Sequence, residues 1–193
     1  MKKRAIFTLA FLMILTIACK NTQKETEQKA EETTTQKEEV TSNINVIKFA
    51  LEPKSDSHVS GTVTFTEENG FVTMVAEMEG LTEGIHAIHI HEKADCSSLD
   101  GKSTGGHWNP TAQPHGKWDA AEGYHKGDIG NFTADASGKG SITFTTDQWC
   151  IGCGDETKDI LGKAVIVHAG TDDYVTQPTG DAGGRISCAG IIQ

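Results

Sequence analysis

Six histidines and one aspartate occur at a spacing that can build two adjacent metal sites. The chain has eight histidines in 193 residues, and six of the eight belong to this set. Neutral imidazole is the commonest metal ligand in proteins, and a domain has little other reason to concentrate so many. The fold must therefore bring distant parts of the chain to one place. The set consists of His89, His91, His107, His115, His125, Asp128 and His168.

The chain after position 43 alternates between short strand-like runs and glycine-rich turns. Apolar or small residues recur at every second position over 59–65, and Asn69-Gly70 behind that run is a strong hairpin signal. No helical period is sustained anywhere after residue 43. Many short strands with such turns favour an all-β sandwich or barrel. We predict eight strands, at 44–51, 58–66, 71–78, 85–91, 128–134, 141–146, 163–168 and 188–192.

Two long segments, 92–127 and 169–187, have no predicted strand of their own. Loops of this length in a compact domain are usually functional or disordered. The first segment carries three of the histidines, so metal ligation would explain how it is ordered.

The position of each histidine along its strand predicts which face of the sheet its side chain is on. His89 and His91 are two residues apart on one strand, so both side chains point to the same face. His168 ends another strand and can meet them if the two strands are neighbours. His86 has the opposite parity, and we interpret it as a packing residue. His58 is likewise interpreted as a structural or surface residue.

The ligand chemistry predicts two different ions. Four imidazoles without a thiolate, supplied by His89, His91, His168 and the loop residue His107, suit copper. Two imidazoles and a carboxylate from His115, His125 and Asp128 make a tetrahedral zinc set once one more histidine joins them.

The N-terminal segment has the pattern of an export signal. Lys2, Lys3 and Arg4 precede an apolar run over 6–18, which is too short to span a bilayer and ends at Cys19. This pattern resembles a bacterial lipoprotein signal, in which the cysteine is lipidated and becomes the mature N-terminus, although Thr16 stands where such signals usually have leucine. An ordinary secreted protein with an unmodified Cys19 is the alternative.

The composition divides the chain into three parts. We expect a signal peptide at 1–18, a lipid-anchor cysteine with a disordered polar tether at 19–43, and a folded domain at 44–193. Without the three N-terminal basic residues, 14 basic residues face 27 acidic ones, a net charge of −13. This balance argues against nucleic acid as a partner. It is also unfavourable for an anionic substrate.

Four cysteines remain when Cys19 is set aside, namely Cys96, Cys150, Cys153 and Cys188. An even number in an exported chain indicates disulfides, and three pairings are open. A zinc site at Cys150-x-x-Cys153 is weakly supported, because no second Cys or His pair follows at the required spacing.

Several segments together resemble the copper/zinc superoxide dismutase family, in the order that the family has them. They are 84–92 (GIHAIHIHE), 105–110 (GGHWNP), 125–131 (HKGDIGN), 165–168 (VIVH) and 180–185 (GDAGGR). The resemblance covers most of 44–193 and implies an eight-stranded Greek-key β-sandwich, or flattened barrel, with two long functional loops. It also implies an enzyme with one copper and one zinc per chain.

The resemblance assigns a role to each site residue. His107 would bridge copper, held with His89, His91 and His168, and zinc, held with His115, His125 and Asp128. Asp172 would hydrogen-bond His89 from the copper side and His115 from the zinc side, and Cys96 would pair with Cys188. Arg185 would position superoxide, so Arg185 and His107 are the expected catalytic residues.

The chain departs from the family pattern in three places. Cys150 and Cys153 are extra, and they could form a second disulfide, remain thiols or divert the other cysteines. The segment after His168 has no lysine, so the basic steering residues of some relatives are absent there. Residue 181 is aspartate where many relatives have asparagine.

The resulting hypothesis is dismutation of superoxide to oxygen and hydrogen peroxide, which would protect the cell envelope. A lipid on Cys19 would hold the protein at a membrane of the periplasm or cell envelope. Members of the family are often dimers, so a homodimer is compatible with the resemblance. The rival hypotheses are a lipoprotein that stores or delivers metal, and an adhesive surface domain that uses zinc only for stability.

Overall fold

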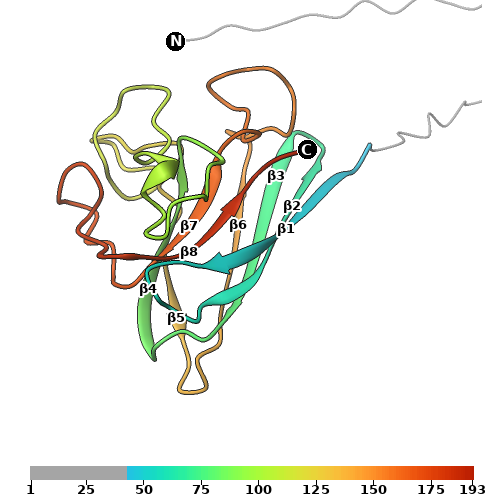
Figure 1. Ribbon diagram of the computed structural model, residues 1–193. Coiled ribbons are helices and arrows are strands. Elements are labelled where there is room, and N and C mark those ends of the chain that lie inside the picture. The colour runs from blue at the N-terminus through green and yellow to red at the C-terminus, as the bar shows by residue number, and fades with distance from the viewer. Residues whose placement is uncertain (1–42) are drawn as a thin grey trace, which may run out of the picture. The chain divides into compact units, whose positions relative to one another are not determined.

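The computed structural model describes residues 43–193, which form eight strands and one short 3-10 helix (Figure 1). The predicted signal peptide, Cys19 and most of the tether lie outside the described residues. None of the helices within 43–193 has the length and apolar character needed to cross a membrane. The elements are β1 (Asn45–Pro53), β2 (Ser60–Glu68), β3 (Phe71–Glu79), β4 (Gly84–His91), η1 (Lys102–Thr104), β5 (Gly130–Ala134), β6 (Gly140–Thr146), β7 (Ala164–His168) and β8 (Arg185–Gly190).

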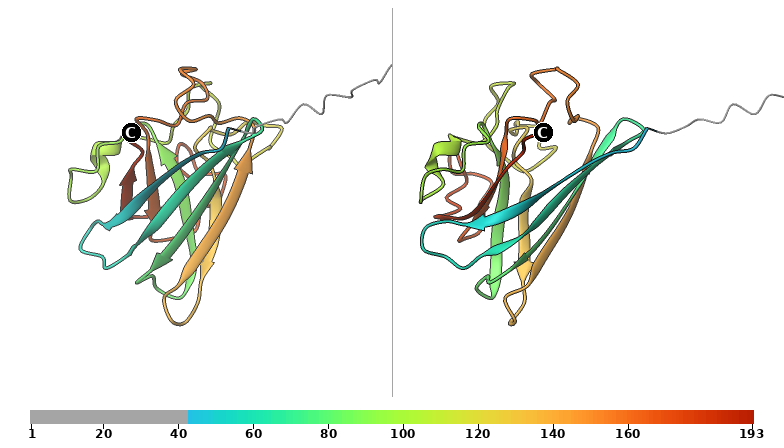
Figure 2. Two further views of the ribbon diagram at one scale, coloured as in Figure 1. Left: turned by 90° about the vertical axis from the view of Figure 1, so that its right-hand side faces the viewer. Right: turned by 45° about the vertical axis from the view of Figure 1, so that its right-hand side comes forward.

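The strands close into an antiparallel barrel in the order β1-β2-β3-β6-β5-β4-β7-β8 (Figure 2). Hydrogen-bonded ladders are short at two seams: only Ala134 and Gly140 pair between β5 and β6, and two residue pairs join β1 to β8. The barrel is therefore flattened into two facing sheets. Because β6 returns to lie beside β3, the strands β3 to β6 have the Greek-key order.

The barrel interior is filled by every second residue of the strands. On β3, Val72, Met74 and Ala76 are fully buried, whereas Phe71 and Val75 are exposed. Burying one such side chain contributes about 1.5–3 kcal/mol. The two-residue period in the sequence therefore corresponds to one apolar core. The facing sheet contributes Ile88, Ile90, Val165 and Val167 to this core.

Strand β4 is the exception, because its residues from His86 to His91 are buried on both faces of the sheet. Ile88 and Ile90 point into the core, so His89 and His91 point outward. The connections 92–129 and 169–184 lie outside the barrel next to β4, β7 and β8 and cover this outer face (Figures 1 and 2). The polar imidazoles are thereby buried without entering the apolar core.

All eight predicted strands are present, but three of them begin two or three residues away from the predicted start. β2 begins at Ser60, so His58 precedes it. β5 begins at Gly130 rather than at Asp128, because the Asp128 carboxylate turns back to accept the backbone N–H of His125 at 2.8 Å. β8 begins at Arg185, three residues earlier than predicted, because Arg185 pairs with His168 across β7 and β8.

Two disulfides are present among the described residues. Cys96–Cys188 joins the long loop after β4 to β8 over 92 residues, in the pairing that the resemblance implied. Cys150–Cys153 closes a ring with a separation of only 3 residues. Of the alternatives open for the two extra cysteines, the structure therefore has the local disulfide. Disulfides are typical of proteins from oxidising compartments.

The two disulfides should differ strongly in their effect on stability. A cross-link stabilises mainly by restricting the unfolded chain, by about 5 kcal/mol for a loop of this length at Cys96–Cys188 and about 2 kcal/mol for the small ring. Denaturant unfolding of metal-free protein should therefore show a much larger loss of unfolding free energy for the double variant Cys96→Ala with Cys188→Ala than for Cys150→Ala with Cys153→Ala. An equal or larger loss in the second double variant would contradict this prediction.

Candidate metal centre

Three of the histidines are placed by two neighbouring strands. β4 carries His89 and His91, and His168 is the last residue of β7. β7 pairs directly with β4, with His89 opposite Ile166. The two strands are therefore neighbours, as the sequence analysis required for these three histidines to meet.

His107 reaches the same place because its loop pairs with the end of β4. β5 covers β4 only as far as Ile88, which leaves the edge beyond it free. The backbone N–H of Trp108 donates to Ile90 O at 2.8 Å, and the N–H of Glu92 donates to Gly106 O at 3.0 Å. This local bridge sets His107 opposite His91.

The first cluster contains His89, His91, His107 and His168, all buried, with their candidate ligand atoms within 4.8 Å of one another. One nitrogen of each ring is buried without a hydrogen-bond partner among the described residues: His89 Nδ1, His91 Nε2, His107 Nε2 and His168 Nε2. Buried polar atoms are rarely left unpaired in proteins. Four such atoms at one point indicate a site for a bound cation.

The opposite nitrogen of three of these rings is held by the protein. His89 Nε2 donates to Asp172 Oδ2 at 2.8 Å, and His91 Nδ1 donates to Gly105 O at 3.0 Å. His168 Nδ1 donates to Gly183 O at 3.4 Å. These contacts fix the tautomer and direct the free lone pair of each ring into the cluster.

The second cluster contains His107, His115, His125 and Asp128, again with all ligand atoms within 4.8 Å. His107 Nδ1 donates to Asp128 Oδ1 at 2.8 Å. His115 Nδ1 lies 3.0 Å and His125 Nδ1 3.2 Å from the same carboxylate, without hydrogen-bond geometry. Three imidazole nitrogens thus face one carboxylate, a donor set of tetrahedral zinc.

His107 belongs to both clusters. Its Nδ1 faces Asp128, and its Nε2, on the other side of the ring, is the partnerless atom of the first cluster. Its ring centroid lies 4.0 Å from that of His89 and 5.3 Å from that of His115. The two clusters are therefore adjacent and share one imidazole.

Asp172 connects the clusters a second time, from behind the ligand rings. Its Oδ2 accepts from His89 Nε2, and its Oδ1 accepts from His115 Nε2 at 2.9 Å. Asn131 on β5 holds the backbone of Asp172 through two hydrogen bonds of 2.8 Å. Gly180, with φ of +68°, packs so closely that a Cβ there would overlap the Asp172 carboxylate.

Burial sets the charge state of these groups. It lowers the pKa of His107 to about 4 and those of His91 and His168 well below the usual value, so these rings are neutral at pH 7. Burial also disfavours the charged form of His115, but the carboxylates of Asp128 and Asp172 beside its two ring nitrogens outweigh burial and raise that pKa to about 9.

The donor atoms fit the two metals that the sequence predicted. Four neutral imidazoles without a thiolate suit copper in the first cluster, and three imidazoles with one carboxylate suit zinc in the second. The six partnerless ring nitrogens come from the six predicted ligand histidines. His86 does not join them, because its ring nitrogens lie 2.9 Å from His168 O and Thr82 O, and it packs on Phe132.

Arg185 lies at the mouth of the first cluster, half-buried. Its Nη1 donates to Gly101 O at 2.9 Å and to Thr104 Oγ1 at 3.0 Å, which fixes one end of the guanidinium. A cavity of about 310 Å³ brings Arg185 together with His91 and His168. An anion in this cavity would meet the guanidinium on its way to the cluster.

Sequence reasoning missed two residues of this region. Lys102 lines the same cavity and forms a 3.2 Å ion pair with Asp100, so a basic residue comes from the first long loop instead of the second. Gln177 clamps the backbone of His115, accepting its N–H and donating to its carbonyl, both at 2.8 Å. Neither position has a sequence signal that separates it from an ordinary loop residue.

Comparison with solved structures finds chains that share this fold and about 30% of this sequence. The solved structures similar to this chain include a SOD-like protein from Bacillus subtilis, at 28% identity over 75% of this chain and 97% of that one, with a TM-score of 0.66. A double mutant of it is 30% identical over 76% of this chain and 97% of its own, also at 0.66. The clock protein EA4 is 33% identical over 76% of this chain and 94% of its own, at 0.65.

The family model described as copper/zinc superoxide dismutase matches residues 59–191, which include every candidate ligand. The match covers more than half of the chain and includes both histidine clusters. This chain is a member of the copper/zinc superoxide dismutase family.

Proposed function

We propose that this protein catalyses the dismutation of superoxide to oxygen and hydrogen peroxide. The observation that supports this proposal best is the convergence of six partnerless, buried ring nitrogens on two clusters that share His107. A protein that only stored metal would have no use for two unlike donor sets joined by one imidazole.

The proposed cofactors are one copper held by His89, His91, His107 and His168, and one zinc held by His107, His115, His125 and Asp128. Bound copper would supply the one-electron chemistry, taking an electron from one superoxide and giving it to the next. Zinc itself has no redox chemistry. The residues on the zinc side would therefore serve to hold His107 and its loop in place.

The proton chemistry is assigned to His107. Its Nδ1 faces the second cluster and its Nε2 faces the first. When the second cluster holds its metal, Nδ1 would carry no proton, so the neutral ring could hold its single proton at Nε2 and pass it to the departing peroxide. Asp172 keeps the neighbouring His89 ring in a fixed orientation during this transfer.

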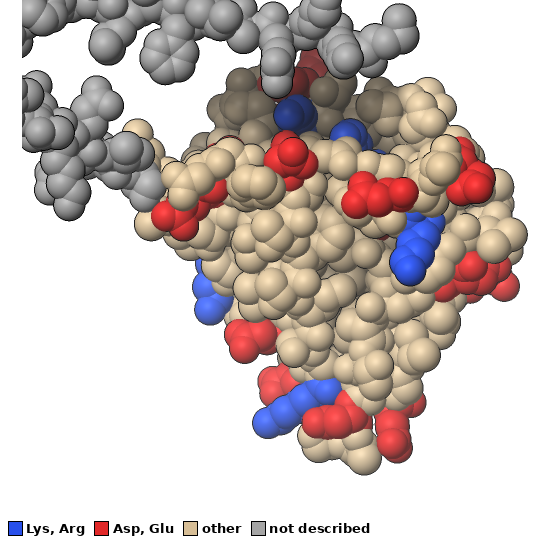
Figure 3. Space-filling model, turned by 180° about the vertical axis from the view of Figure 1, so that it is seen from behind, with Lys and Arg blue, Asp and Glu red and all other residues tan. Residues whose placement is uncertain are grey.

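Superoxide is an anion, and the chain has an excess of acidic residues. The face in Figure 3 shows acidic side chains spread over the surface with basic ones between them. Because salt screens distant charges over about 10 Å, the local electric field at the cavity matters more than the net charge of the whole chain. Arg185 would attract the anion there, whereas the charge of Lys102 is offset by Asp100 in the same cavity lining.

The proposed location is the periplasm or cell envelope, where the enzyme would remove superoxide generated outside or within the envelope. The support is the two disulfides together with the export signal in the sequence. Anchoring through a lipid on Cys19 and assembly into a homodimer are further parts of this proposal.

Metal content and superoxide decay, measured together on the purified mature protein, test the function. We expect two metals per chain and fast decay that cyanide inhibits. His107→Ala should lower kcat/KM by at least about a hundredfold, equivalent to roughly 2.7 kcal/mol. His58→Ala, outside both clusters, is the control and should leave the rate unchanged. Bound copper without superoxide decay would indicate storage, and zinc alone without activity would indicate a scaffold.

Arg185→Ala should lower kcat/KM by about tenfold or more, near 1.4 kcal/mol, because it removes the fixed positive charge beside the cluster. Pulse radiolysis at several salt concentrations measures this, and Arg185→Lys should retain part of the rate. Lys48→Ala, an exposed lysine on β1, is the matched control. Equal rates for Arg185→Ala and the parent at full copper loading would rule out the role of Arg185.

Zinc binding to the second cluster should depend on pH. The pKa of His115 is raised to about 9, so below that pH zinc must displace a proton from this ring. Apparent zinc affinity should therefore rise by about tenfold per pH unit between pH 6 and 8. Chelator competition measures it. Asp172→Asn removes one carboxylate that raises this pKa, so the zinc affinity of this variant should stop rising at a lower pH than that of the parent. An affinity independent of pH would contradict this.

A further inference from the structure

The Cys150–Cys153 disulfide lies in the connection between β6 and β7, outside both histidine clusters, and the proposed dismutation makes no use of it. We propose that it is a thiol–disulfide exchange site, attacked at Cys153 by the thiolate of a low-molecular-weight thiol. The proposal rests on the exposure of Cys153, on the hydrogen bonds that shape its loop and on the neighbouring cavity.

The two cysteines of this disulfide differ in exposure. Cys153 is exposed, whereas Cys150 is 6% exposed and packed below the loop. The other disulfide offers no comparable entry, because Cys188 is fully buried beneath Ala164 and Ile166 and Cys96 is partly buried. Exchange requires a thiolate to reach one sulfur, so access favours Cys153 over the other three cysteines within residues 43–193.

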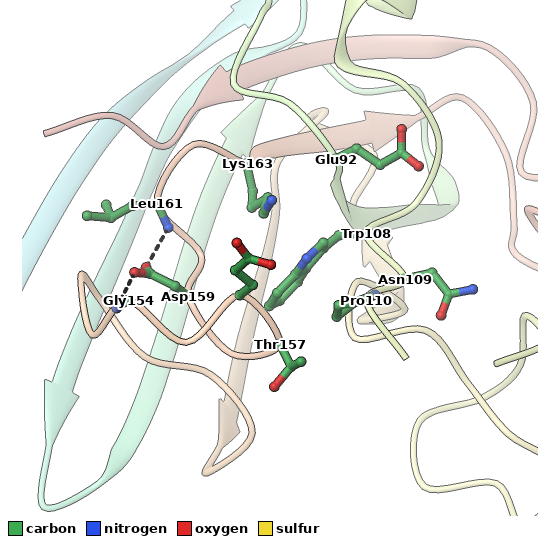
Figure 4. Close-up of a pocket in the computed structure, with 10 residues that line it drawn as sticks. Glu92, Trp108, Asn109, Pro110, Gly154, Thr157, Asp159, Leu161 and Lys163 are labelled. Atoms are coloured by element: carbon green, nitrogen blue, oxygen red, sulfur yellow. Dashed lines mark hydrogen bonds between the residues drawn. The ribbon is translucent and has the colours of Figure 1, made fainter. Parts of the chain in front are cut away.

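The loop conformation is held by hydrogen bonds that do not depend on the disulfide. The Asp159 carboxylate accepts the backbone N–H groups of Gly154 at 2.9 Å and of Leu161 at 3.0 Å (Figure 4). It also accepts the N–H of Gly152 at 2.9 Å. These bonds enclose Cys153 from both sides along the chain. A reduced loop would therefore keep its two sulfurs close together.

The backbone of Cys150 is fixed in the same way. Its N–H donates to Lys158 O at 2.9 Å, and its carbonyl accepts from Ile160 at 3.1 Å. The preceding Trp149 is almost fully buried and donates through Nε1 to Lys126 O at 2.8 Å. Breaking the sulfur–sulfur bond thus leaves the loop anchored at both ends, and the small ring contributes little loop entropy.

A cavity of about 580 Å³ lies beside this loop and gives a thiol room to approach. Gly154, the neighbour of Cys153, lines it on one side, and Trp108 on the other. Figure 4 shows these two sides facing each other across the cavity. Lys163, also in the lining, holds its amino group 5.7 Å from the Trp108 ring. The lining also carries the carboxylates of Glu92, Glu156 and Asp159, so a small thiol with an amino group fits it better than one with carboxylates.

In the first step of the exchange, the external thiolate forms a bond to Cys153 Sγ while the bond between Cys153 and Cys150 breaks. The attacking sulfur is thereby oxidised, and Cys150 leaves as a thiolate. Cys150 then takes a proton from water. A second thiolate can attack the external sulfur of the mixed disulfide, which releases the oxidised thiol and leaves both cysteines reduced.

Two single variants of the full chain test the direction of attack without any reductant. Cys150→Ser leaves Cys153 as a free thiol, and Cys153→Ser leaves Cys150. In the folded, metal-loaded protein, iodoacetamide should alkylate Cys153 at least about tenfold faster than Cys150, because only Cys153 is exposed. Equal rates, or faster alkylation of Cys150, would overturn the assignment. Circular dichroism confirms that both variants are folded.

Exchange itself is measured on the unmodified protein with cysteamine, a small thiol with an amino group, as the probe. After acid quenching and alkylation, peptide mapping should show the cysteamine adduct on Cys153 and opening of Cys150–Cys153 while Cys96–Cys188 stays intact. Trp149, next to Cys150, should report the opening by a change in fluorescence. Opening of Cys96–Cys188 first, or of both disulfides only when the circular dichroism of the fold is lost, would overturn the proposal.

Discussion

One shared imidazole is the constraint on which the rest of the site depends. His107 must present Nδ1 to Asp128 and Nε2 to the first cluster at the same time, so its ring cannot rotate without breaking one of the two sets. Its position is set by backbone bonds between the loop at 106–108 and the free edge of β4. Each buried acceptor without a partner costs about 1–3 kcal/mol, so a metal that uses these lone pairs also stabilises the loop that carries them.

The barrel and the site are built on opposite faces of the same strands. The apolar core holds Ile88 and Ile90, while His89 and His91 face outward under the two long loops. Rigid strands therefore position three of the seven candidate ligands, and the loops position the other four. The loops are fastened by side-chain contacts outside the backbone ladders: the Cys96–Cys188 disulfide to β8, the Asn131 amide of β5 on Asp172 and the Gln177 amide on His115.

Sequence periodicity predicted the fold well, because the chain alternates in and out of one core. It predicted all eight strands and the parity that separates His86 from His89 and His91. It was wrong where side chains compete with the backbone ladder, as at Asp128, whose carboxylate caps the turn at His125. It was also wrong at Arg185, which pairs with His168 through a bulge that has no pattern in the sequence.

The sequence by itself determined which side chains are available, since ligand type and two-residue spacing are local properties of the chain. It identified the seven candidate ligands and limited the cysteines to three pairings. Only the tertiary structure decided which nitrogen of each ring is free. It also brought Lys102 of the first long loop to the cavity beside Arg185. These facts depend on contacts between residues far apart along the chain, and such contacts are fixed only when the strands close into the barrel.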